Sequence, residues 1–196
     1  WDTIQMWLKV VVACIPGAVV TILFDDYIEA HLHTPVVIAA ALIVYGIAFI
    51  LIENWNKKRT PKVNTLGEIT YRTAFLIGLF QVLSLVPGTS RSGSTILGAM
   101  ILGCSRSAAA EFSFFLGIPV MFGASLLKLV KFGFHFTGLE LFYLIAGMVI
   151  AFVVSVYSIK FLMGYIRKNN FKVFGYYRIV LGIIVLFYFG VTAFLG

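Results

Sequence analysis

Continuous apolar runs, separated by short polar connectors, extend along the whole chain. A membrane-spanning helix needs about 20 apolar residues, whereas the strands of a membrane barrel alternate apolar and polar residues over about ten positions. These runs do not alternate, so they predict helices. We expect helices at residues 7–24, 35–53, 112–130 and 141–163, and a last helix that starts near Tyr176. The pattern predicts an all-α integral membrane protein, a polytopic helical bundle whose residues 1–196 form a single transmembrane domain.

Composition supports a membrane protein and limits the classes of partner. The chain is 61% hydrophobic and 12% charged, whereas soluble domains carry about 25% charged residues. Its net charge is +7, and the basic residues fall mainly between the apolar runs. That distribution follows the positive-inside rule and suits anionic membrane lipids as partners. The same distribution does not favour nucleic acid as a partner.

Two connectors differ in charge. Residues 25–34 are acidic and contain no lysine or arginine, whereas residues 54–72 are basic. The basic residues of the second connector are Lys57, Lys58, Arg59, Lys62 and Arg72. The positive-inside rule therefore places residues 54–72 in the cytoplasm and residues 25–34 outside. His31 and His33 could ligate a metal, but without further ligand spacing they are more often ordinary loop residues, and we assign no metal ligand.

Two apolar segments in the middle of the chain are too short to span a membrane. Residues 73–86 number fourteen and residues 94–104 number eleven. They could form one broken span, or a re-entrant hairpin that returns to its starting side. The hairpin leaves four basic residues inside (Arg167, Lys168, Lys172 and Arg178) against two outside (Lys128 and Lys131), and the broken span reverses these counts. Charge therefore favours a re-entrant half-helix hairpin around the loop 87–93.

The loop between these segments has the composition of an anion site. An arginine at membrane depth costs roughly 2.5–3.5 kcal/mol, so Arg91 needs an anion or a water-filled cavity. Glycines free backbone N–H groups, and a helix that starts at Ser94 would direct its positive end into the same space. We expect six residues to bind a phosphate-bearing substrate: Gly88, Thr89, Ser90, Arg91, Ser92 and Gly93. Alternatively, Arg91 could extend to the membrane surface and the serines could satisfy loose backbone groups.

Sequence patterns also predict helix starts and one ion pair. Thr34 precedes Pro35 as an N-cap, and the capping-box patterns that begin at Thr65 and Thr137 each predict a helix start. Ser105 or Ser107 can cap the helix that follows the hairpin. Glu111, about one turn beyond Arg106, predicts an ion pair with it at least as well as a catalytic role.

Several motifs together resemble one bacterial enzyme family. They are Pro87-Gly88-Thr89-Ser90-Arg91-Ser92-Gly93, the preceding Tyr71-Arg72-x-Ala74-Phe75-x-Ile77-Gly78-x-x-Gln81, and the following Ser105-Arg106-x-x-Ala109-x-Glu111-Phe112-Ser113-Phe114 with Pro119. The combination resembles the second signature of bacterial undecaprenyl-diphosphate phosphatases of the BacA/UppP type. The resemblance implies a multi-pass enzyme of the bacterial inner membrane that hydrolyses undecaprenyl diphosphate and recycles the lipid carrier for cell-wall synthesis. It also implies inverted repeats, of which this chain would hold about half, and a site that opens outward. Arg91 and Ser90 would be the catalytic residues, with Ser92 beside them.

One part of that family's pattern is absent from this sequence. The glutamate-rich signature of the first repeat, E-G-x-x-E-F-x-P-V-S-S-T-G-H, does not occur in it. The resemblance implies a divalent cation, Mg or Ca, whose ligands would come from that signature. We therefore expect an N-terminally truncated fragment that could be inactive alone. The expected partner is a polyprenyl diphosphate lipid, and a homo-oligomer is an open option.

The alternative function, from another class of protein, is transport. The chain would then be a transporter or flippase for an anionic lipid or a phosphate-bearing substrate. Secondary transporters also direct the N-termini of broken helices at anionic substrates. The chain offers such binding groups and no convincing catalytic carboxylate near Arg91. A weaker alternative is an assembly protein in which the loop only packs. Hydrolysis predicts phosphate release, whereas transport leaves the diphosphate intact.

Overall fold

The computed structural model describes residues 2–133 and 136–195, which are helical apart from short connectors. The elements are α1 (Asp2–Leu32), α2 (Pro35–Asn56), α3 (Tyr71–Val82), the short 3₁₀ helix η1 (Leu83–Leu85), α4 (Arg91–Ile101), α5 (Arg106–Phe132), α6 (Gly138–Lys168) and α7 (Lys172–Leu195). In these ranges five helices are long and apolar enough to cross a membrane: α1, α2, α5, α6 and α7. The predicted all-α polytopic fold is confirmed.

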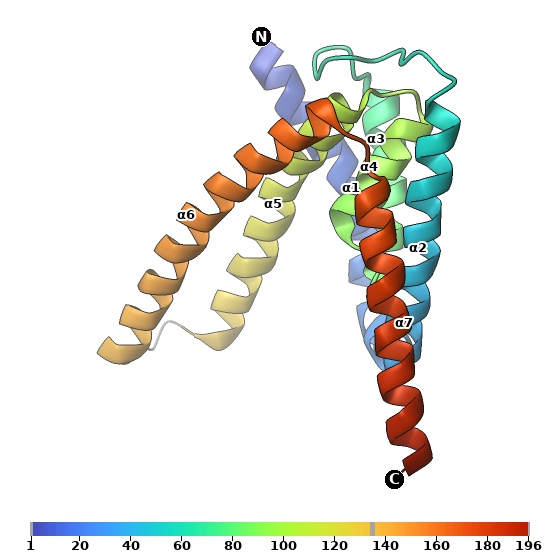
Figure 1. Ribbon diagram of the computed structural model, residues 1–196. Helices are drawn as coiled ribbons and strands as arrows, with labels where there is room; N and C mark the ends of the chain where they lie inside the picture. The colour runs from blue at the N-terminus through green and yellow to red at the C-terminus, as the bar shows by residue number, and fades with distance from the viewer. Residues whose placement is uncertain (1, 134–135, 196) are drawn as a thin grey trace.

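The longest helices follow one another up and down, so the connectors gather at two ends (Figure 1). We call one end the connector end: it carries residues 57–70, 102–105 and 169–171. Several predicted bounds were wrong, two of them in α1 and α7. α1 continues to Leu32 instead of ending at residue 24, and α7 begins at Lys172 instead of near Tyr176. Residues 25–32 contain no glycine or proline, so nothing in that stretch stops the helix.

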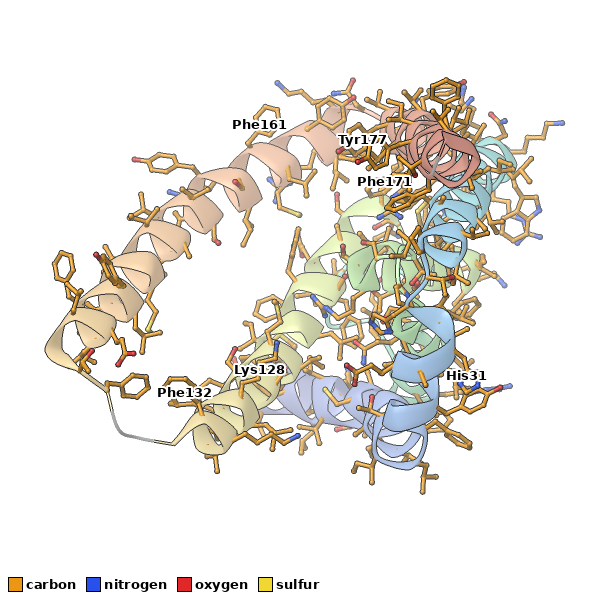
Figure 2. The ribbon with its side chains drawn as sticks, turned by 90° about the horizontal axis from the view of Figure 1, so that it is seen from below. His31, Lys128, Phe132, Phe161, Phe171 and Tyr177 are labelled. Carbon is orange, nitrogen blue, oxygen red and sulfur yellow. The ribbon has the colours of Figure 1, made fainter. Side chains whose placement is uncertain are left out.

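Glycines bring two pairs of helices into close contact. A Cβ atom on Gly46 of α2 would lie 2.7 Å from the carbonyl oxygen of Gly175 on α7, and Gly182 lies as closely against α2. Gly78 of α3 packs in the same way on the backbone of Ala13 in α1. Small residues at such contacts let helix backbones approach where lipid supplies no hydrophobic driving force. By contrast, α6 diverges from the bundle, and its residue Phe161 points away from the other helices (Figure 2).

The two short helices α3 and α4 form a hairpin whose ends meet at the connector end. The N–H of Lys62 donates to the carbonyl of Gly103 at 2.9 Å, and the N–H of Ser105 donates to Val63 at 2.8 Å. The chain therefore enters and leaves the hairpin at the same end of the bundle, which contradicts a single broken span. Re-entry of the hairpin into a membrane, and its place in an inverted repeat, stay predictions.

A buried carboxylate holds three segments together at the connector end. Glu53 of α2 is fully buried, and its Oε1 accepts from Nε of Arg106 at 2.6 Å and from Nη2 of the same side chain. Its Oε2 accepts from the backbone N–H of Phe171 at 3.1 Å. The predicted pairing of Arg106 with Glu111 was wrong, because Arg106 turns inward to α2. Glu111 instead lies 3.8 Å from Arg167.

The predicted helix start at Thr65 was also wrong. Glu68 accepts from the N–H of Asn64 at 2.7 Å and from the hydroxyl of Thr65 at 3.0 Å, and it thereby closes a turn in the connector. α3 begins only at Tyr71, after Thr70 accepts from the N–H of Thr73 at 3.1 Å. The expected caps at Thr34, Ser105 and Thr137 are confirmed.

The Glu68 turn predicts a local loss of structure in acid. The hydrogen bonds from Asn64 and Thr65 lower the pKa of Glu68 below its ordinary value of 4.5. The turn is therefore at full stability above that value and loses stability as the pH falls through the lowered pKa. Hydrogen exchange of the Asn64 amide should show this loss. A Glu68→Gln variant should lack it, and equal pH dependence in both proteins would contradict the assignment.

The Glu53 site predicts a large loss of stability when one partner is removed. Glu53→Gln leaves the guanidinium of Arg106 without its counter-charge, which should lower the free energy of unfolding by about 3 kcal/mol. Thermal melting of the detergent-solubilised protein measures the effect. Glu111→Gln removes the same charge from an exposed pair and should cost about 0–1 kcal/mol. Equal melting temperatures for the two variants would refute the buried site.

Candidate anion-binding site at the hairpin loop

The loop reverses the chain through glycine and lies against α2. Gly88 has a φ of +94°, a backbone conformation that favours glycine. A Cβ atom there would lie only 2.5 Å from the carbonyl oxygen of Ile38, in the first turn of α2. The loop therefore sits near the end of α2 that is distant from the connector end. Both the turn and this close approach require residue 88 to be glycine.

Ser90 caps the second helix of the hairpin from a strained backbone. Its φ is 63°, which costs a non-glycine residue about 1–3 kcal/mol and is typical of functional sites. Its Oγ accepts from the N–H of Gly93 at 3.3 Å and lies 3.3 Å from Oγ of Ser92. α4 therefore begins at Arg91, and the predicted start at Ser94 was wrong. The N-terminal amides of α4 belong to the polar loop itself.

Thr89 uses its hydroxyl within the loop. The side chain is 3% exposed, and its Oγ1 donates to the carbonyl of Val86 at 2.8 Å and to that of Leu83 at 3.1 Å. These bonds stabilise the reversal of the chain after η1. The hydroxyls of Ser90 and Ser92, by contrast, lie beside the start of α4. A substrate contact of Thr89 stays a prediction.

Arg91 stands half-buried in the first turn of α4, against a glycine of α5. A Cβ atom on Gly117 would lie 2.5 Å from Nη2 of Arg91, so the absence of a side chain at 117 makes room for the guanidinium. Within the described ranges, Nη1 of Arg91 is buried and has no hydrogen-bond partner. An unsatisfied buried donor costs about 1–3 kcal/mol, and more when it is charged. The side chain is thus placed to donate to an anion.

The turn that carries Arg91 is bound to α5. Thr95 donates to the carbonyl of Arg91 at 3.0 Å, and its hydroxyl shares a hydrogen bond of 2.7 Å with Ser113 of α5. Thr95 and Ser113 are both buried. These contacts fix the direction in which Arg91 leaves α4.

Two further polar atoms in the hairpin are buried without partners among the described residues. They are Oε1 of Gln81 on α3 and Oγ of Ser94 on α4. Ser94 lies three residues beyond Arg91 and so on the same face of α4. Gln81 packs on α1, where a Cβ atom on Gly17 would lie 3.0 Å from its Nε2. The interior of the hairpin thus holds two further polar atoms that can form hydrogen bonds.

Arg178 of α7 is a loop contact that the sequence did not indicate. Its Nη1 donates to the carbonyl of Thr89 at 3.2 Å and to that of Gly88 at 3.3 Å. The charge count places Arg178 on the cytoplasmic side, and the structure adds that its guanidinium contacts the loop. The side of the membrane on which Arg178 lies stays a prediction. The two partners are about ninety residues apart in sequence, and no local pattern reports such a contact. Arg178 is a positioning residue for the loop.

The two histidines of the acidic connector lie apart from this site. Nδ1 of His31 is 3.0 Å from the carbonyl oxygen of Tyr27, and the rings of these two residues stack. Nδ1 of His33 is 3.4 Å from the carbonyl oxygen of Ile28. Figure 2 shows His31 at the outside of the bundle. Across residues 2–133 and 136–195, no three His, Cys, Asp or Glu side chains group closely enough to hold a metal.

Arg178→Gln should loosen the loop. The variant loses two charge-assisted hydrogen bonds, so the amides of residues 88–93 should exchange hydrogen at least about tenfold faster. Hydrogen exchange with mass spectrometry measures this rate. Lys172→Gln removes the same charge from the start of α7 and should leave these amides unchanged. Equal exchange in the Arg178 variant and the wild type would refute the positioning role.

Comparison with known proteins gives one consistent result. The family described as bacitracin resistance protein BacA matches residues 1–184. A protein of Enterococcus faecalis named undecaprenyl-diphosphatase is 65% identical over 94% of this chain and 67% of its own length. Relatives of the same name from Desulfitobacterium hafniense and Lachnoclostridium phytofermentans are 59% and 64% identical, over 70% and 68% of their lengths.

Proposed function

The chain belongs to the bacitracin resistance protein BacA family, and we propose that it hydrolyses undecaprenyl diphosphate to undecaprenyl phosphate and inorganic phosphate. This hydrolysis regenerates the lipid carrier for cell-wall synthesis. The observation in the structure that carries the proposal is a buried guanidinium nitrogen of Arg91, in a hydroxyl-rich loop, that has no hydrogen-bond partner among the described residues. An undecaprenyl-diphosphatase, as the relatives are named, must recognise a diphosphate, and this nitrogen is placed to donate to one.

The loop supplies the charge neutralisation that phosphoryl transfer needs. Negative charge on the transferred phosphoryl group is stabilised by cations and by preorganised N–H donors. Arg91 provides a fork of donors that matches phosphate oxygens, and the positive end of α4 points from the same place. Ser90 and Ser92 add hydroxyls within hydrogen-bonding reach of one another. These groups would hold the diphosphate while its apolar tail lies among the membrane helices.

The hydroxyl of Ser90 also stabilises the loop itself. The Oγ of Ser90 caps α4 through Gly93, which holds it at the edge of the loop. A hydroxyl or a water molecule needs a base to accept its proton. The hydrogen bonds recorded for Ser90 involve Ser92 and Gly93, and neither is a base. Arg91 therefore binds the diphosphate and neutralises its negative charge. Ser90 holds its hydroxyl beside the phosphate.

A divalent cation is implied by the family resemblance, and we propose that its ligands come from the glutamate-rich first-repeat signature that this sequence lacks. The described residues do not form such a site by themselves, since they contain no group of three acidic, histidine or cysteine side chains around a common point. No step proposed for Arg91, Ser90 or Ser92 passes through a metal.

The site is proposed to face outward from the bacterial inner membrane. The connector end is rich in lysine and arginine, which the positive-inside rule assigns to the cytoplasm. The loop lies near the opposite end of α2, beside Ile38. The hairpin would then enter from the cytoplasmic side and present Arg91 toward the outer leaflet. A homo-oligomer remains an open proposal.

Arg91→Gln should abolish most of the hydrolysis. Loss of the guanidinium removes the main positive charge at the phosphate, which should lower kcat/KM by about 10²–10³-fold. Phosphate release from undecaprenyl diphosphate in detergent, with the full-length protein, measures this. Melting temperature controls for folding. Activity equal to wild type would refute the proposal, and binding of an intact diphosphate without release would favour a transporter.

Gly117→Ala should impair the enzyme by displacing Arg91. The new methyl group would occupy the place of Nη2, so the flexible guanidinium must move while the fold remains. A displacement of about 1 Å can cost up to about 10²-fold in rate, and at least about tenfold is expected here. Gly123→Ala is the matched control, since nothing lies within 4 Å of a Cβ there. Equal activities of the two variants would show that the position of Arg91 does not matter.

A further inference from the structure

A second cationic site lies at the connector end, remote from the hairpin loop. A cavity of about 910 Å³ opens there between three segments of the chain. Residues 56–62 form one wall, residues 100–107 form another, and Ile166 and Arg167 at the end of α6 complete it. Because the segments are distant in sequence, the cavity is a product of the fold and not of one basic run.

The charges that line this cavity have one sign. The six cationic residues are Lys57, Lys58, Arg59, Lys62, Arg106 and Arg167. Two carboxylates pair with members of this set, but neither lines the cavity. Glu53 is buried beneath Arg106, and Glu111 lies 3.8 Å from Arg167. Four lysine and arginine side chains thus remain without an ion pair among the described residues. Self-repulsion among them would be relieved by a bound anion.

The cavity is lined by apolar groups as well as by cations. Met100, Leu102 and Ile166 contribute to its lining. Next to it, the guanidinium of Arg59 stacks on the ring of Trp55, with Cζ 3.6 Å from the ring centroid. Trp55 is 41% exposed near the end of a spanning helix, a position typical of the membrane interface. This position predicts that the cavity lies at the depth of lipid head groups.

We propose that this cavity, the connector pocket, binds the phosphate group of an anionic ligand, either a lipid head group or a soluble phosphate. Basic pockets between membrane helices bind phosphorylated lipid head groups through charge-assisted hydrogen bonds. Lys58, Arg59 and Lys62 form the cationic wall, and Arg106 is held in place by Glu53. The pocket is separate from Arg91: α4 runs from Arg91 in the hairpin loop to Ile101 in the pocket lining.

The test compares two variants of equal charge in the full-length protein. One carries Lys58→Gln, Arg59→Gln and Lys62→Gln in the pocket. The other carries Lys128→Gln, Lys131→Gln and Lys160→Gln on α5 and α6, outside it. Phosphatidylglycerol, phosphatidylcholine and inorganic phosphate are each titrated into the detergent-solubilised proteins. Native mass spectrometry counts bound lipid, and the shift in melting temperature reports binding of each probe.

The pocket variant should bind the effective probe at least about tenfold more weakly, whereas the control variant should match the wild type. Saturable binding of phosphatidylglycerol alone would identify a lipid head group, and an equal response to inorganic phosphate would identify a soluble ligand. An equal loss of probe binding in both variants would show that net charge alone explains the effect, and it would overturn the proposal. Failure of the wild type to bind either anionic probe would overturn it as well. Neither result depends on phosphatase activity.

Discussion

A guanidinium held inside an apolar bundle is the constraint on which the rest of this structure depends. Arg91 is half-buried and one of its nitrogens has no partner among the described residues. Such a group is tolerated only where an anion or water meets it, and the backbone around it must leave the helical conformation without stranding its own polar atoms. The hairpin meets the second need. It reverses at Gly88, satisfies its carbonyls through Thr89 and Arg178, and begins α4 at Arg91 itself.

The neighbouring helices hold this loop in place from several sides. α2 gives it a close backbone contact at Ile38, α5 receives the guanidinium at Gly117, and α7 binds its carbonyls through Arg178. At the connector end, hydrogen bonds from the N–H groups of Lys62 and Val63 to the carbonyl of Gly103 join the two ends of the hairpin. These contacts fix the backbone of the loop, and the proposed stabilisation of charge in a transition state requires such preorganised groups. α6 diverges from the bundle over most of its length (Figure 1), and it is not among the helices that make these loop contacts.

Local chemistry was predictable from the sequence, whereas long-range contacts were not. The apolar runs predicted the spanning helices, and the residue types within one stretch of seven positions were enough to predict an anion site at Arg91. Among the described residues, Nη1 of Arg91 has no hydrogen-bond partner, and anion binding there stays a prediction. The partners of Arg106 and Arg178 could not be inferred, since each arginine crosses to another helix. The capping-box pattern at Thr65 led to a wrong helix start for a related reason. Its side chains can close a turn as well as cap a helix, and only the surrounding fold decides between the two.

The central claim is that the hairpin loop and the basic connector lie on opposite sides of the membrane. Labelling with a membrane-impermeant maleimide tests it in intact bacteria that express the full-length protein with Cys14→Ser and Cys104→Ala. Ser92→Cys, introduced into this background, should react from outside, whereas Lys62→Cys should react only after the membrane is opened. Reaction of both cysteines from the same side would contradict the account.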